Sequence, residues 1–201
     1  MNNYPSIFND VIGPVMRGPS SSHCAAAVRI GRLARDLMGG RIEHVRVEFD
    51  AKGSLAHTHA GQGSDMGLFG GLLGWDAQDE RLLDAAAALA QAGIRIELGI
   101  GEYHDAHPNT YRLTLSDAGE THRMIALSTG GGMVEVVEID GIPLSIKGDY
   151  VETLVAVDAV DMALHETLTH TVAAEDVLLH AGTDKTTTTT PSAPPAPKKQ
   201  G

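Results

Sequence analysis

The sequence contains one cysteine, Cys24, among its 201 residues. A single cysteine excludes a framework of disulfide bonds within the chain. It also falls short of the three or four thiolates that hold an ordinary iron–sulfur cluster. Any cofactor of that kind must therefore be anchored elsewhere.

Positive charge and long apolar runs are scarce as well. Lysine and arginine total 15 against 26 aspartates and glutamates, a net charge of -11 that argues against a nucleic-acid partner. No stretch approaches the roughly 20 apolar residues that span a bilayer, and the opening MNNYPSIFNDVIG lacks the basic and apolar segments of a signal peptide. We therefore expect a cytoplasmic protein, without membrane contact, whose partners are small molecules and other proteins.

The composition predicts one folded domain followed by less ordered sequence. Hydrophobic residues make up 42% of the chain, enough for one buried core. Threonine and proline dominate the last 17 residues, which lack bulky apolar side chains and cannot offset their ordering entropy. The expected organisation is a domain over residues 1–150, a weakly helical extension over 151–184 and a disordered tail over 185–201.

Hydrophobic periodicity predicts an α+β fold. Helical spacing covers three segments, which are Cys24–Met38, Ser64–Leu73 and Glu80–Ala92. The first is expected to be capped by Ser22 and the second by Ser64 or Asp65. Alternation of apolar and polar residues predicts strands near residues 45–49, 94–100, 111–115 and 134–139. We expect a mixed or antiparallel sheet with helices packed on it.

The first of three polar loops precedes the first predicted helix and reads Gly-Pro-Ser-Ser-Ser-His over residues 18–23. Serine hydroxyls beside the N–H groups of a helix start offer a seat for a carboxylate or phosphate. An ordinary N-cap explains any one of the serines equally well, but three before a histidine exceed what capping needs. The candidate site residues here are Ser20, Ser21, Ser22 and His23.

The second polar loop, residues 53–65, joins a strand end to a helix start. Active sites gather at such places, because the backbone can approach a ligand and the helix dipole favours anions. If the loop is extended, His57 and His59 point to one side, but no third ligand is close in sequence, so we expect polar loop histidines rather than a metal site. The candidate binding residues are Gly53, Ser54, Gln62, Ser64 and Asp65.

The third polar loop, residues 128–133, lies between two expected apolar strands and contains Gly130, Gly131 and Gly132 after Ser128. Three glycines weaken a sheet unless a bend, a positive φ or a close ligand requires them. Successive N–H groups in such a bend form an anion nest, although a plain bulge or hairpin is the simpler explanation of the glycines alone. The segment 107–110, His-Pro-Asn-Thr, either orients Asn109 inward or is a plain turn.

Four segments, in this order, resemble the beta domain of iron–sulfur-dependent L-serine dehydratases. They are SIFNDVIGPVMRGPSSSH, GSLAHTHAGQGSD, HPNT and STGGGMVEVVEIDG, and the resemblance covers about residues 5–149. In two-subunit members of that family this domain is the beta chain, and an alpha chain carries the cysteines of a 4Fe-4S cluster. The resemblance therefore implies a hetero-oligomer whose cysteine-containing alpha-type partner holds the cluster.

The reaction implied by the resemblance is an α,β-elimination that converts L-serine to pyruvate and ammonia. The open iron of the cluster acts as a Lewis acid on the substrate hydroxyl, and a base removes the α-proton. Carried over by position, residues 20–23 face the active site, and Ser128 with the three glycines holds the substrate carboxylate. Ser64 stands where the family has a threonine that contacts the substrate.

Two departures from the family pattern leave alternatives open. Many beta chains continue into an ACT domain, for which the residues after Val151 are too few and too poor in strand pattern. The family's GxGHxTD-type loop presents a histidine base, but this sequence has Gln62 there, and an amide cannot accept the proton. His59, His23 or a partner residue is then the expected base, for L-serine or for another hydroxy or hydroxyamino acid. The alternative is a non-catalytic binding or regulatory module, as in some phosphoglycerate dehydrogenases.

Overall fold

The computed structural model describes residues 16, 18–149 and 154. The predicted tail over 185–201 lies outside the described residues, and so does the predicted helical extension over 151–184 apart from Leu154. Within the described part of the chain, no helix has the length and apolar character needed to cross a membrane.

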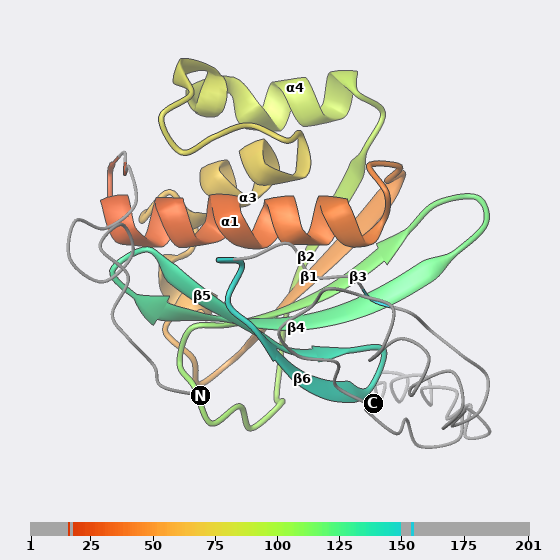
Figure 1. Ribbon diagram of the computed structural model, residues 1–201. Helices are drawn as coiled ribbons and strands as arrows, with labels where there is room; N and C mark the ends of the chain where they lie inside the picture. The colour runs from red at the N-terminus through yellow and green to blue at the C-terminus, as the bar shows by residue number, and fades with distance from the viewer. Residues whose placement is uncertain (1–15, 17, 150–153, 155–201) are drawn as a thin grey trace, which may run out of the picture.

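Six strands of the described residues form one mixed sheet in the order β2-β1-β3-β4-β5-β6 (Figure 1). β1 pairs with β2 in parallel, and the other neighbours pair antiparallel. The predicted α+β fold with a mixed sheet is confirmed, and β6 is a strand that the sequence did not reveal. The bounds are β1 His44–Asp50, β2 Arg95–Gly101, β3 Thr110–Ser116, β4 Thr121–Gly130, β5 Met133–Ile139 and β6 Ile142–Ile146.

Helices cover one face of this sheet (Figure 1). They are α1 Ser21–Leu37, α2 Leu55–Thr58, α3 Ser64–Leu72 and α4 Ala85–Gln91, and the 3₁₀ helix η2, Glu80–Asp84, precedes α4. The alternate side chains Val45, Val47 and Phe49 of β1 are buried in the core that the helices and sheet share. A sheet covered on one face requires this alternation, which is why the strands could be located from the sequence.

Some local expectations were wrong. Ser20, not Ser22, is the N-cap of α1, and Gly63 takes this position before α3 in place of Ser64 or Asp65. Gly63 has a φ of 78°, where an L side chain is strained, so a glycine is favoured there. The predicted helix over residues 80–92 is divided into η2 and α4.

Glycines allow α1 and α3 to pack with their backbones in close approach. A Cβ atom added at Gly31 of α1 would lie 2.5 Å from the carbonyl oxygen of Leu68 in α3. Cβ atoms added at Gly67 and Gly71 of α3 would overlap the backbone of α1. The two helices therefore fix each other's position.

The topology gathers the polar loops at one end of the sheet. Because β1 and β2 are parallel, the segments that follow them leave the sheet at the same end. β3 starts at that end, and the antiparallel β4 returns to it, so the β4–β5 connection also lies there. α1 begins beside these loops, as the hydrogen bonds described below show.

Candidate functional site

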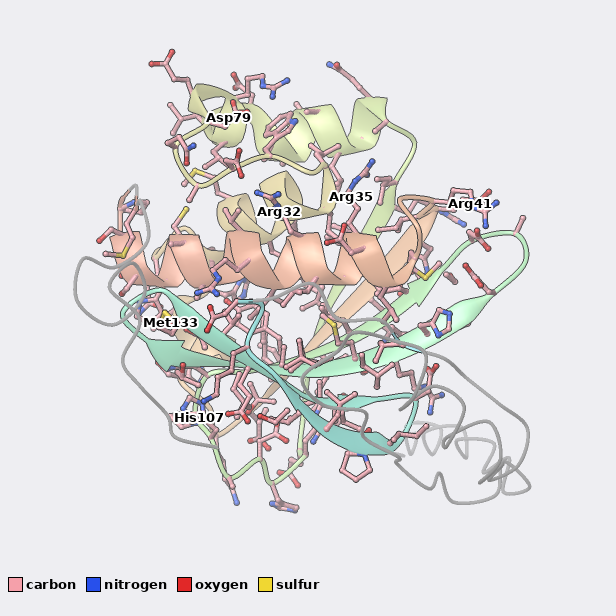
Figure 2. The ribbon with its side chains drawn as sticks, in the orientation of Figure 1. Arg32, Arg35, Arg41, Asp79, His107 and Met133 are labelled. Carbon is pink, nitrogen blue, oxygen red and sulfur yellow. The ribbon has the colours of Figure 1, made fainter. Side chains whose placement is uncertain are left out.

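Four polar loops lie together at this end. We name residues 18–23 the serine loop, 53–65 the histidine loop, 107–110 the HPNT turn and 128–133 the glycine loop. His107 and Met133 lie on the side of the molecule where α1 begins, whereas Arg41 lies at the opposite end (Figure 2). An open cavity of about 710 Å³ lies beside Arg41, and none of its lining residues belongs to the four loops.

Backbone hydrogen bonds connect the four loops in series. The N–H of Ser20 donates to the carbonyl of Gln62 at 3.2 Å, which joins the serine and histidine loops. The N–H of Ser54 donates to the carbonyl of Pro108 at 2.8 Å, and the N–H of Ser128 donates to the carbonyl of Asn109 at 3.0 Å. The fold therefore brings together all four segments that the sequence singled out.

His59 forms a histidine–carboxylate pair with Asp65. Its Nδ1 atom lies 2.7 Å from Oδ1 and 2.8 Å from Oδ2 of Asp65. Because an ionised carboxylate only accepts hydrogen bonds, Nδ1 carries the hydrogen between the two groups, and in the neutral imidazole Nε2 has the lone pair. The imidazole also stacks on Phe49, with ring centroids 5.1 Å apart. His59 is thus held in the tautomer that can accept a proton at Nε2.

The other two candidate histidines are placed differently. Residues 55–58 form α2, so the extended arrangement that would put His57 and His59 on one side is not present, and His57 is exposed. Nδ1 of His23 lies 2.8 Å from the hydroxyl oxygen of Ser20, within the first turn of α1. Among the residues that the structure describes, no group of three or more His, Cys, Asp and Glu is placed to hold a metal ion.

The glycine loop is a tight connection between β4 and β5. Gly130, Gly131 and Gly132 have φ values of 106°, 61° and 82°, so the bend itself requires glycines. Gly130 and Gly131 are exposed. The carbonyl of Gly132 accepts a hydrogen bond from Arg29 of α1 at 3.4 Å. The loop is therefore anchored to α1 at its last glycine and open to a ligand at the first two.

Four buried side-chain atoms among the described residues have no partner at hydrogen-bonding geometry, and all four lie in this region. They are Gln62 Oε1, Ser64 Oγ, Asn109 Oδ1 and Tyr111 OH. An unsatisfied buried polar atom costs about 1–3 kcal/mol, so folded proteins leave few of them. Their concentration in one place indicates a site that a polar ligand completes.

Tyr111 is the member of this group that the sequence did not reveal, because its alternation with Leu113 and Leu115 suggested only a buried strand. The residue is 1% exposed, its ring packs edge-on against Phe49 at 5.5 Å, and the Ser64 hydroxyl lies beside it. Burial raises the pKa of Tyr111 despite the opposing effect of Ser64, so the phenol stays neutral. The sequence signal for Tyr111 is a tyrosine at an inward position of a strand whose other inward residues are leucines, because a buried tyrosine hydroxyl needs a hydrogen-bond partner.

Asp50 fixes the start of the histidine loop. Its Oδ1 accepts the N–H of Lys52 at 2.7 Å, and its Oδ2 accepts the N–H groups of Tyr103 and Asp105 at 3.0 Å each. These hydrogen bonds, above all the one from Lys52, lower the pKa of the buried Asp50 carboxyl, although burial opposes them. The ionised side chain ties the end of β1 to the segment that follows β2.

Replacing Asp50 with asparagine should lower the free energy of unfolding near neutral pH, and the difference should shrink as the pH falls from about 7 to about 2. The folded pKa lies below the unfolded value of about 3.9, so the stabilisation is present above that value and is lost as the pH falls through the folded pKa. Urea unfolding of the wild type and the variant at both pH values measures the difference in the free energy of unfolding. Asp36→Asn, at an exposed position of α1, is the control. A difference for Asp50→Asn that is the same at both pH values would contradict this explanation.

Comparison of this chain with known proteins shows the family to which it belongs. Residues 10–105, which include the serine and histidine loops, match the family model described as serine dehydratase beta chain. The "Probable L-serine dehydratase, beta chain" of Bacillus subtilis (strain 168) is 43% identical over 152 residues, which are 76% of this chain and 68% of the relative. The "L-serine dehydratase, beta chain" of Peptoniphilus asaccharolyticus is 37% identical over 145 residues, which are 70% of this chain and 64% of the relative.

The fold and the four loops define an α+β domain with a group of unpartnered buried polar atoms and a histidine–carboxylate pair in the same loops. The chain belongs to the serine dehydratase beta chain family. The family resemblance inferred from the four motifs is confirmed. The roles of the individual site residues stay predictions.

Proposed function

We propose that this chain is the subunit of an L-serine dehydratase that binds the substrate and supplies the catalytic base. The observation that carries the proposal is the group of four unpartnered buried atoms next to the His59–Asp65 pair. A polar ligand satisfies those atoms, and a proton acceptor stands beside it. The names of both relatives support L-serine as that ligand.

In the proposed reaction, residues of this chain bind the substrate and move one proton. The glycine loop, in which Gly130 and Gly131 are exposed, binds the carboxylate through backbone N–H groups as an anion nest does. Nε2 of His59 accepts the α-proton, and Asp65 stabilises the imidazolium that forms. The β-hydroxyl leaves as hydroxide and takes up a proton to become water, and the resulting enamine tautomerises to an imine that one water hydrolyses to pyruvate and ammonia.

We assign the 4Fe-4S cluster, and with it the activation of the leaving hydroxyl, to an alpha-type partner in a hetero-oligomer. The described residues of this chain do not fit a cluster, because Cys24 is buried inside α1 with 0% exposure and one thiolate is too few. The cytoplasmic location expected from the sequence stays a prediction.

Iron binding tests where the cofactor is held. After anaerobic incubation with iron and sulfide, the full chain alone should hold no stoichiometric cluster and should release no pyruvate from L-serine. The pair formed with the alpha-type chain should do both, as measured by iron analysis and a coupled pyruvate assay. A stable brown protein with about four irons per chain, formed without the partner, would contradict the assignment of the cluster to the partner.

A further inference from the structure

The four unpartnered atoms have a chemical character of their own. The side-chain oxygens of Gln62 and Asn109 are amide carbonyl oxygens, which accept hydrogen bonds and cannot donate them. The hydroxyls of Ser64 and Tyr111 accept as well as donate. A carboxylate has no hydrogen to donate and so cannot satisfy the two amide oxygens. The ligand group at this position must therefore carry several hydrogen-bond donors.

The same four side chains belong to neighbouring segments and are uncharged. Gln62 and Ser64 flank Gly63 in the histidine loop, and the Ser64 hydroxyl lies beside that of Tyr111. Asn109 lies in the turn just before β3, two positions ahead of Tyr111 in the chain. Burial keeps Tyr111 protonated, so no formal charge arises within the group.

Charge around the site differs between its two sides. On one side the Asp65 carboxylate follows Ser64 directly and raises the pKa of Tyr111. On the other side the glycine loop offers backbone N–H groups, with the Arg29 guanidinium behind it. The hydrogen bond from Ser128 to Asn109 joins the two sides. A ligand with a cationic donor group next to an anionic acceptor group, as in an α-amino acid, matches this arrangement.

We propose that these side chains form an ammonium-binding subsite that restricts the substrate to hydroxyamino acids and rejects 2-hydroxy acids. The subsite consists of Gln62 Oε1, Asn109 Oδ1, Ser64 Oγ and Tyr111 OH. It rests on the proposed function and gives Gln62 a role of its own. The amide accepts a hydrogen bond at every pH, whereas a histidine in its place would repel an ammonium once protonated.

Comparing L-serine with L-glycerate tests the subsite, because L-glycerate carries a hydroxyl in place of the ammonium. In a titration of the full chain followed by two-dimensional ¹H–¹⁵N NMR, L-serine should bind at least about 10-fold more tightly, as expected for losing one charge-assisted hydrogen bond. Gln62→Leu and Tyr111→Phe should each weaken L-serine binding about 10-fold and leave L-glycerate unchanged. Gln62→Glu should instead increase the preference for L-serine, which a purely structural role of Gln62 does not explain.

Tyr103→Phe is the matched control, because it removes a phenol hydroxyl that donates to Glu48 at 2.7 Å and lies outside the four loops. Both affinities should stay the same in this variant. Equal binding of L-serine and L-glycerate, or no binding of L-serine, would overturn the subsite. Pyruvate release from L-serine by the reconstituted pair reports separately on the proposed function. An active pair that binds L-serine and L-glycerate equally would contradict the subsite and leave the proposed function standing.

Discussion

Replacing His59 with alanine should lower kcat for the elimination of L-serine by the reconstituted pair about 10²- to 10⁴-fold, the range that a positioned general base contributes. Asp65 holds the imidazole with Nδ1 engaged and Nε2 available. His59 contributes none of the four unpartnered atoms, so KM for L-serine should change far less than kcat. Initial rates of pyruvate formation over a range of L-serine concentrations separate the two parameters.

Two further variants identify the base. Asp65→Asn should also lower kcat, because the amide NH₂ can donate to Nδ1 and so favours the tautomer whose Nε2 carries the proton. Gln62→Ala should raise KM and leave kcat within a few-fold, because the amide binds substrate and moves no proton. The opposite pattern, with His59→Ala active and Gln62→His faster than the wild type, would place the base of this enzyme at position 62.

Replacing Gly71 with alanine should lower the free energy of unfolding by about 3 kcal/mol or more, which is the upper range for overpacked cores. The added Cβ atom would overlap the carbonyl of Val28 and the Cα of Gly31, and both are backbone atoms that cannot rotate away. The α1–α3 crossing must then open. Because α1 and α3 begin in the serine and histidine loops, L-serine binding should fall together with stability.

Gly99→Ala is the control for this substitution. Gly99 lies in β2 and does not have a positive φ, and an added Cβ atom would meet the Glu48 side chain at 3.6 Å, an ordinary contact. Its effect on the free energy of unfolding should stay within about 0.5 kcal/mol. Urea unfolding followed by circular dichroism measures both variants. Similar stabilities for Gly71→Ala and Gly99→Ala would show that the helix crossing adapts to a side chain.

The sequence predicted the elements whose periodicity is strong. Val45, Val47 and Phe49 alternate because one face of β1 is covered, and the apolar residues of α1 recur at helical spacing because one side of the helix is buried. The close approach of α1 and α3 could not be predicted in this way. Glycines such as Gly31 and Gly71 lie far apart in the chain, and only the crossing of the two helices shows why they are required.

The candidate site was predicted in its segments and not in its geometry. The serine run stood out because it exceeds what capping needs, and the histidine and glycine segments stood out by their place between predicted elements and by their order in the family pattern. His59 follows α2 directly, and this four-residue helix, which the sequence did not predict, comes before the residue that pairs with Asp65. Tyr111 was missed because a tyrosine fits a buried strand pattern as well as leucine does, and the pattern carries no information about its hydroxyl.

The most direct test of the proposed function is the release of pyruvate and ammonia from L-serine by the anaerobically reconstituted pair of this chain and its alpha-type partner. The wild-type pair should release the two products in equal amounts, and neither chain should do so alone. The contradicting result is L-serine binding by the chain without release of any 2-oxo acid by the pair, over a panel of hydroxyamino and 2-hydroxy acids. That result would identify the chain as a binding or regulatory module.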